Sequence, residues 1–373
     1  MTTPAYRGRP VPDPDRVRRR MVLLAEGRFG PLTSKTANQA IRYLGDEVVA
    51  VIDSTRAGST AGEQLGYGGP IPVVADLPAA MRFEPSVLLI GIAPAGGLLP
   101  EGWRPVILDA LNRGLHIVSG LHTHLGADPE FSACAKASRT SITDLRLVPG
   151  NHLAVSKGLW RGRKAKTILT VGTDCNVGKM TASLELHNEF LRRGITSDFV
   201  ATGQTGILLA GRGVAVDAVP GDYIAGAIET ELSERDMEAG FLHVEGQGAL
   251  THQGYSAVTA GLLHGVMPDA MILVHHPARR RDDYGRSLDD LPGIIALYEA
   301  FVQPFRRSKV AGIAVNPALM TGAETAAAME DIRQSTGLPV ANVRTPGIGL
   351  LADALLEYLH SCAPADQGGA EKQ

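Results

Sequence analysis

The chain has 373 residues, 44% hydrophobic and 20% charged, so it is long enough for two domains that each have a core. Its 36 Lys and Arg against 39 Asp and Glu leave a formal charge of −3, which argues against a nucleic-acid coat protein. No run of about 20 apolar residues predicts a membrane span, and three scattered cysteines predict neither a disulfide framework nor a Cys-based zinc site. We therefore expect a cytoplasmic protein without a nucleic-acid or membrane partner.

The two ends of the chain have the composition of disordered segments. Residues 1–20 hold four prolines and a basic run, and they lack the apolar stretch of a signal peptide. Residues 363–373 are rich in polar residues and glycine. We predict a disordered arm over 1–20 and a disordered tail over 363–373.

Short apolar runs alternate with helical segments in the first half of the chain, which predicts βαβ units and a parallel sheet. The predicted strands cover 21–25, 47–52, 72–74, 87–90 and 116–118, with a helix over 37–44. A basic polar stretch at 156–166 is typical of a linker, so we predict a Rossmann-like domain over 21–155.

Ligands of open α/β sheets bind beyond the carboxyl ends of the strands. The segments that follow the predicted strands, and so form the candidate site, are 27–36, Asp53, 91–97 and 119–124. Asp53 stands where a Rossmann protein carries its ribose carboxylate, although a helix-capping or turn role fits equally. Thr36 either caps the following helix or meets a phosphate. The histidine pair at 122 and 124 lacks the third ligand that a metal site needs.

The second half carries a phosphate-binding signature. A predicted strand at 166–171 runs into a glycine loop, a Gly-Lys pair and a helix over 179–193. Backbone N–H groups of such a loop form an anion nest at the helix N-terminus, and the lysine adds a point charge. We predict a P-loop NTPase-like domain over 156–362 whose cofactor-binding residues are Gly172, Thr173, Asp174, Asn176, Val177, Gly178, Lys179, Met180 and Thr181.

Two features depart from the common phosphate-loop pattern G-x4-GK-[ST]. Five residues separate Gly172 from Gly178, and Met180 follows the lysine where a Mg²⁺-binding hydroxyl usually stands. Thr181, one residue later, is our candidate for that hydroxyl.

Further polar residues follow the predicted strands of this half. The residues that we expect to bind the carboxylates of a substrate are Gln204, Thr205, Arg279 and Arg280. A second carboxylate ligand for Mg²⁺ is expected at Asp217. The candidate catalytic residues are His275, His252 and Lys179. A solvated loop or helix start is the alternative for the Asp217 and Arg279 segments.

The loop sequence GTDCNVGK resembles that of dethiobiotin synthetase and the cobyrinate amidase-type P-loop enzymes. Two more segments resemble theirs, VEGQG and VAGIAVNP. The resemblance implies that Glu245 helps to hold Mg²⁺ at the phosphates and that Asn316 reads the nucleotide base.

A narrower resemblance covers residues 20–360. The motifs GTDCNVGKMT, ATGQTG, VEGQG, LLHG and PDAxxLVHH occur in the order seen in a family long catalogued as a domain of unknown function and typified by D-glutamate N-acetyltransferase. That resemblance implies acylation of the amino group of an acidic amino acid, with acetyl-CoA as donor.

Three functions remain open at this point. The leading one is an acyltransferase acting on a small acidic amino acid, with the loop holding the CoA diphosphate. The second is an ATP- and Mg²⁺-dependent carboxylate ligase or kinase, and the third is a nucleotide-binding regulatory protein. In each case we expect a small-molecule ligand and a homo-oligomer.

Overall fold

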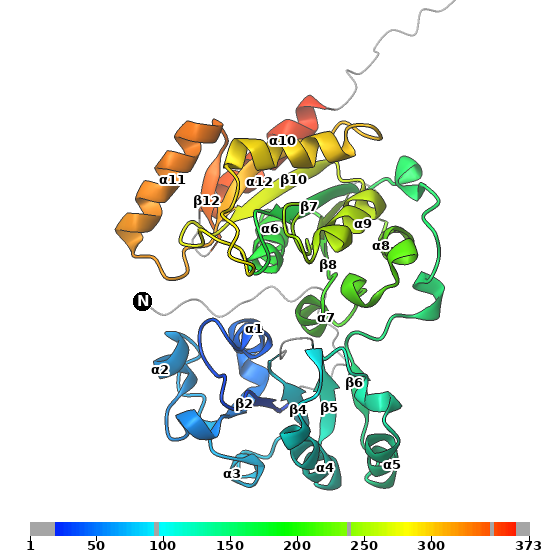
Figure 1. The fold of residues 1–373 in the computed structure, drawn as a ribbon, viewed down its shortest axis with the longest axis vertical. Helices are drawn as coiled ribbons and strands as arrows, with labels where there is room; N and C mark the ends of the chain where they lie inside the picture. The colour runs from blue at the N-terminus through cyan, green and yellow to red at the C-terminus, as the bar shows by residue number, and fades with distance from the viewer. Residues whose placement is uncertain (1–18, 93–96, 237–239, 344–346, 363–373) are drawn as a thin grey trace, which may run out of the picture. The chain divides into compact units, whose positions relative to one another are not determined.

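The computed structural model describes residues 19–92, 97–236, 240–343 and 347–362, and the chain divides into two compact units (Figure 1). The first unit contains the chain up to Val148 together with Gly203–Ala218, and the second contains Pro149–Thr202 and the chain from Val219 onward. Each unit is built on a six-stranded sheet whose strand pairs are all parallel. The predicted α/β class with two parallel sheets is thereby confirmed.

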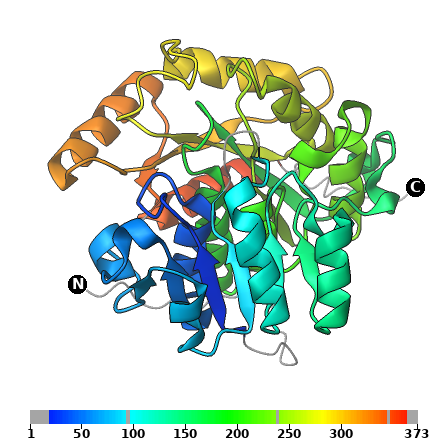
Figure 2. The ribbon, with the colours of Figure 1, turned by 60° about the horizontal axis from the view of Figure 1, so that its bottom comes forward.

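The first sheet has the strand order β3-β2-β1-β4-β5-β6, which is the doubly wound Rossmann order. Its strands and helices are β1 Met21–Leu24, α1 Lys35–Tyr43, β2 Val48–Ile52, α2 Ala61–Leu65, β3 Val73–Val74, α3 Leu77–Met81, β4 Val87–Ile90, α4 Arg104–Asn112, β5 His116–Ser119, α5 Pro129–Ala137, β6 Ile142–Asp144 and α7 Gln204–Ala210. Every residue of β1 is buried, as expected of a central strand in a parallel sheet covered by helices. Helices α4 and α5 lie side by side (Figure 2).

The second sheet has the order β12-β11-β10-β7-β9-β8. Its elements are β7 Lys166–Gly172, α6 Lys179–Arg192, β8 Ser197–Val200, α8 Ile224–Ser233, β9 Phe241–Val244, α9 Ser256–Val266, β10 Ala270–His275, α10 Leu291–Val302, β11 Val310–Val315, α11 Gly322–Thr336, β12 Val340–Asn342 and α12 Ile348–Ser361. Strand β7 pairs with β9 and β10, so the loop that follows β7 lies at the carboxyl edge in the middle of the sheet. Leu186 of α6 and Leu355 of α12 pack with Ile272 of β10 in one buried core.

The domain limits differ from the predicted ones in two ways. The units meet at Val148 and Pro149 rather than near residue 156, and residues 203–218 belong to the first unit although they follow β8 of the second. The reason for the second difference is packing, because α7 contacts α1 and buries Leu208 and Leu209. The sequence pattern alone does not indicate that a segment packs in a unit other than the one that surrounds it in the chain.

The predicted arm and tail lie outside the described residues, apart from the last two arginines of the arm. Arg19 donates from Nε to Glu47 at 3.1 Å, and Arg20 donates to the carbonyl of Glu84 at 2.8 Å, so both are held against the first unit. The predicted arm is therefore too long at its C-terminal end. Among the described residues, no helix has the length and apolarity needed to cross a membrane.

Candidate functional site

The phosphate loop leaves the first turn of α6 open for an anion. Strand β7 ends at Gly172 and α6 begins at Lys179, with Gly178 as an N-cap that offers no side chain. Asn176 and Gly178 have φ values of 56° and 110°, which turn successive backbone N–H groups toward one side. The N–H groups at the start of a helix lack internal acceptors, so this geometry suits a phosphate or carboxylate.

Two side chains from other elements hold the loop in place. Asn316 donates from Nδ2 to the carbonyl of Val177 at 3.0 Å, so its amide braces the loop, where the sequence resemblance implied contact with a base. Tyr298 of α10 donates to the carbonyl of Gly172 at 2.8 Å and accepts from the backbone N–H of Leu250 at 3.1 Å. We did not single out Tyr298 from the sequence, because a tyrosine in an apolar helix is typical of a core position.

Lys179 lies folded over the loop. Its side chain is buried and Nζ donates to the carbonyl of Asp174 at 2.8 Å. A methyl group on Gly246 would lie 3.1 Å from Cδ of the lysine and 1.7 Å from the carbonyl oxygen of Thr170. Glycine at 246 therefore leaves the space through which the lysine passes between β7 and the end of β9.

Glu245 follows β9 and is buried beside the loop. Its Oε2 accepts from the backbone N–H of Thr202 at 3.1 Å, and Thr202 donates from Oγ1 to the backbone carbonyl of Glu245 at 2.6 Å. Met180 is buried in the second position of α6, whereas Thr181 is partly exposed. Of the three predicted Mg²⁺ ligands, Thr181 and Glu245 belong to the second unit and Asp217 to the first.

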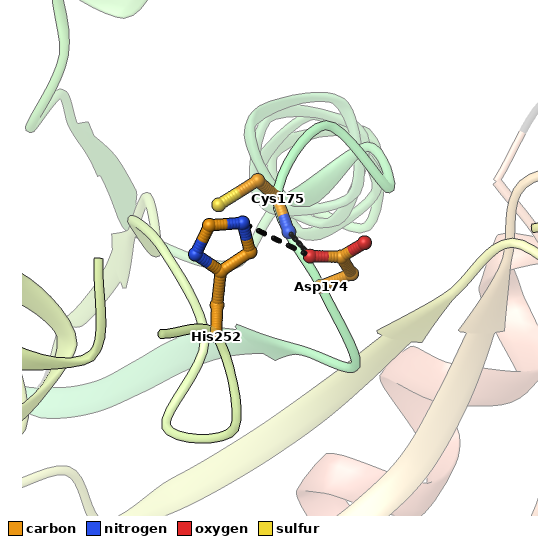
Figure 3. Close-up of side chains that lie close together, drawn as sticks. All are labelled: Asp174, Cys175 and His252. Atoms are coloured by element: carbon orange, nitrogen blue, oxygen red, sulfur yellow. Dashed lines mark hydrogen bonds and ion pairs between the residues drawn. The ribbon is translucent and has the colours of Figure 1, made fainter. Parts of the chain in front are cut away.

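A second group of polar side chains lies at the tip of the loop (Figure 3). Asp174 accepts from the backbone N–H of Cys175 at 2.7 Å, and its Oδ1 lies 3.8 Å from Nε2 of His252. The His252 side chain is 1% exposed, stacks on Tyr255, and accepts at Nδ1 from the backbone N–H of Gly254 at 3.2 Å. Figure 3 shows the imidazole facing both the carboxylate and the thiol.

The predicted arginines differ in their surroundings. Arg279 donates from Nε to Asp174 and from a terminal nitrogen to Asp283 at 2.7 Å, so its charge is already shared by two carboxylates. Arg280 is exposed. Of the two, Arg280 is the one whose guanidinium is open to a substrate carboxylate.

His275 ends β10 next to the loop. Its Nδ1 lies 3.0 Å from the hydroxyl oxygen of Thr173. Burial lowers the pKa of His275 to about 4, and the nearby His276 and Arg280 act in the same direction. The imidazole is therefore neutral at pH 7, with one nitrogen able to accept a proton.

The remaining predicted substrate residues lie in the first unit. The hydroxyls of Thr205 and Thr36 are 3.2 Å apart, and the side chain of Gln204 lies over Gly120 at the end of β5. Asp217 pairs with the buried Arg146. These side chains therefore hold residues 203–218 against the first sheet.

The predicted ribose carboxylate of the first sheet, Asp53, is bound to backbone groups of its own unit. Asp53 is fully buried, accepting from the backbone N–H groups of Phe29 at 2.8 Å and Thr55 at 2.9 Å, so the capping interpretation applies. The N-cap of α1 is Ser34, and not Thr36 as one of our interpretations expected. Residues 93–96 of the predicted 91–97 segment lie outside the described residues.

A Rossmann-like unit followed by a unit whose central strand runs through a phosphate loop into a helix defines a two-domain P-loop protein. The chain belongs to the DUF1611 family: residues 54–147 match its Rossmann-like domain and residues 154–352 match its P-loop domain, both described as domains of unknown function. The resemblance drawn from the sequence motifs is thereby confirmed.

Relatives in this family carry an enzyme name. A D-glutamate N-acetyltransferase from Tritonibacter scottomollicae is 39% identical over 276 residues, covering 72% of this chain and 80% of that protein. One from a Pseudoalteromonas species is 36% identical over 273 residues, covering 72% and 81%. A crystal structure of a DUF1611 family protein from Anabaena variabilis superposes with a TM-score of 0.87 at 37% identity, covering 91% of this chain and 99% of that one.

Proposed function

We propose that the protein transfers the acetyl group of acetyl-CoA to the amino group of a small acidic amino acid, with D-glutamate as the first acceptor to test. The observation that carries this proposal is the name shared by two relatives at 39% and 36% identity, each matched over 72% of the chain.

The phosphate loop fits the diphosphate of CoA. The uncapped first turn of α6 and the left-handed residues Asn176 and Gly178 offer backbone N–H groups, and Lys179 adds a positive charge. An ordinary nucleotide would use the same donors, but Met180 removes the hydroxyl that commonly binds Mg²⁺ in a nucleotide triphosphate site. We therefore assign the diphosphate of the acyl donor to this loop.

The reaction needs a free amine. The acceptor ammonium first releases one proton, and the amine nitrogen then attacks the thioester carbonyl carbon to form the C–N bond. The C–S bond breaks, and the second proton lost from the nitrogen goes to the leaving CoA thiolate. His275 is neutral at pH 7, because burial lowers its pKa to about 4, so one ring nitrogen can accept a hydrogen bond from the free amine and orient it for attack. Arg280 is exposed next to it and supplies a positive charge for an acceptor carboxylate.

This assignment is tested by the release of CoA thiol with D- and L-forms of glutamate and aspartate. Each acceptor is assayed with acetyl-CoA and with acetyl-pantetheine, which keeps the thioester but lacks the phosphates. If the loop holds the diphosphate, Lys179→Ala lowers kcat/KM for acetyl-CoA and leaves the low value for acetyl-pantetheine unchanged. An equal loss for both donors would place the lysine on the acceptor instead.

The proposal fails if no acidic amino acid releases thiol from either donor. ADP release from ATP that depends on a carboxylate substrate would instead favour the ligase or kinase. Tight nucleotide binding without turnover of any acceptor would favour a regulatory protein.

A further inference from the structure

Three different metal-binding donors converge at the tip of the phosphate loop. A carboxylate oxygen of Asp174, the sulfur of Cys175 and a ring nitrogen of His252 lie within 4.8 Å of one another (Figure 3). Two of them are neighbours on the loop, and the third comes from the segment between β9 and α9. Because His252 is distant in sequence from the loop, the sequence alone indicated no such group.

The imidazole is the unusual member of this group. His252 is 2% exposed, and within the described residues its buried Nε2 has no hydrogen-bond partner. The nearest carboxylate oxygen, Oδ1 of Asp174, is 3.8 Å away, which is too long for a hydrogen bond. An oxygen and a nitrogen ligand at about 2.0–2.2 Å from one tetrahedral ion lie roughly 3.3–3.6 Å apart, so a small turn of the imidazole toward Oδ1 would bring both atoms to one ion.

The neighbours of these side chains hold them in this arrangement. Arg279 donates to Oδ2 of Asp174 and leaves Oδ1 facing the imidazole. Tyr255 stacks on the ring of His252 with 5.0 Å between ring centroids. Ligating carboxylates and imidazoles in metal sites are commonly fixed in this way by a second layer of contacts.

One contact must change when an ion binds. Nδ1 of His252 accepts from the backbone N–H of Gly254 at 3.2 Å, which places the ring proton on Nε2. Binding through Nε2 moves that proton to Nδ1 and breaks the hydrogen bond with the Gly254 amide. The site therefore gives up one hydrogen bond as the ion enters, and the proton released is that of the Cys175 thiol as it becomes the bound thiolate.

We propose that Asp174, Cys175 and His252 bind a divalent transition-metal ion at the tip of the phosphate loop. Thiolate, imidazole and carboxylate together are the donor set of Zn²⁺, and three protein ligands leave a fourth position for water or substrate. The ion adds positive charge beside the anion-binding turn of α6. This proposal stands on the geometry of the cluster and does not depend on acyl transfer.

Cobalt reports on such a site without any measurement of activity. The full-length protein is stripped with a chelator and titrated with Co²⁺, which gives visible bands in a tetrahedral site and a near-ultraviolet charge-transfer band when a thiolate is bound. We expect saturation at one ion per chain, competition by Zn²⁺, and protection from alkylation of one thiol.

Single substitutions locate the ion. Cys175→Ser removes the charge-transfer band, and His252→Gln weakens Co²⁺ binding by at least about tenfold. Cys134→Ser and Cys362→Ser remove the other two thiols of the chain and leave the band intact. Thermal melting of each metal-free variant shows that it is folded.

Two results would overturn the proposal. One is the absence of saturable Co²⁺ or Zn²⁺ binding by the stripped protein. The other is bound Co²⁺ whose spectrum survives Cys175→Ser, which would place the ion elsewhere, as at the group formed by His152, Glu231 and Glu234. Loss of acyl transfer in an assay with acetyl-CoA bears only on the proposed function.

Discussion

Substitution of Lys179 should change ligand affinity without changing the stability of the fold. Its ammonium reaches back to the carbonyl of Asp174 and not into the apolar core of α6. Lys179→Ala should weaken binding of CoA or ADP by about 2–5 kcal/mol, the usual cost of removing one partner of a desolvated charge pair. Calorimetric titration of each ligand measures the loss.

The same variant should melt close to the unchanged protein when no ligand is present. Lys136→Ala, which removes an exposed lysine of α5, is the matched control and should alter neither property. Unchanged affinity of Lys179→Ala together with a lowered melting temperature would show that the lysine is structural.

At the level of single residues, the sequence located side chains better than it assigned their roles. Lys179 and Glu245 lie beside the loop because strand order alone brings the ends of β7 and β9 together. Asn316 and Asp53 are also at strand ends, yet both bind backbone groups of their own unit. A strand-end position indicates where a polar group lies, while its partner depends on tertiary contacts that periodicity does not encode.

Among the structural elements, the end of β9 has no room for an added methyl group. The Cβ of Gly246→Ala would lie 1.7 Å from the carbonyl oxygen of Thr170, so the backbone after β9 has to move. We expect a loss of about 1–3 kcal/mol in the free energy of unfolding, as for other overpacked sites. Chemical denaturation measures it, with Gly221→Ala as control because nothing lies within 4 Å of its Cβ. Equal stability of the two variants would contradict this close packing.

Two buried histidines between α6 and β9 should make the protein less stable in acid. His243 is fully buried, and neither of its ring nitrogens has a hydrogen-bond partner among the described residues. Burial lowers the pKa of His187 to about 4 and holds that of His243 well below its usual range. The unfolded chain takes up these protons near pH 6.5, so stability contributed by the neutral rings is lost as the pH falls below 6.5.

The size of this effect follows from the displacement of the pKa values. Between pH 6.5 and pH 5 His187, with its folded pKa of about 4, should cost about 1.6 kcal/mol of unfolding free energy, and His243 should act in the same direction. His243→Leu should reduce the slope of stability against pH over this range, measured by urea denaturation at several pH values. His360→Leu, which alters an exposed histidine of α12, should leave the slope unchanged. Parallel slopes for all three proteins would contradict the buried-histidine explanation.

Apolar composition explains which strands the sequence predicted. The continuous apolar runs at 21–25 and 87–90 match β1 and β4 within a residue. We did not predict β6 and β12, which contain the polar residues Asp144 and Asn342. The edge strand β3 is shorter, but both of its residues are buried valines and it lies within the predicted run 72–74.

For the molecule as a whole, the sequence predicted two α/β units, but it did not predict that residues 203–218 belong to the first unit. The boundary signal was a basic polar stretch, which marks a linker yet says nothing of a segment that returns to the other unit. Buried Val214 and Val216 and the Thr36–Thr205 hydroxyl pair hold the segment in the first unit. The first 148 residues therefore lack part of the first unit, whereas residues 149–373 contain all of the second unit and one segment of the first.

Because residues 203–218 belong to the first unit, we can predict which amides are protected in a fragment that contains only the second half of the chain. In a fragment of residues 149–373, α7 loses α1 and the segment loses Arg146 as the partner of Asp217, which exposes apolar side chains and a carboxylate. Hydrogen exchange should then be fast over 204–216 in the fragment and slow in the full-length chain, because backbone amides are protected only where local structure persists. Strand β7 and helix α6 should be protected in both, since their core partners β10 and α12 lie within the fragment. Equal protection of 204–216 in the two proteins would mean that the segment folds without the first unit.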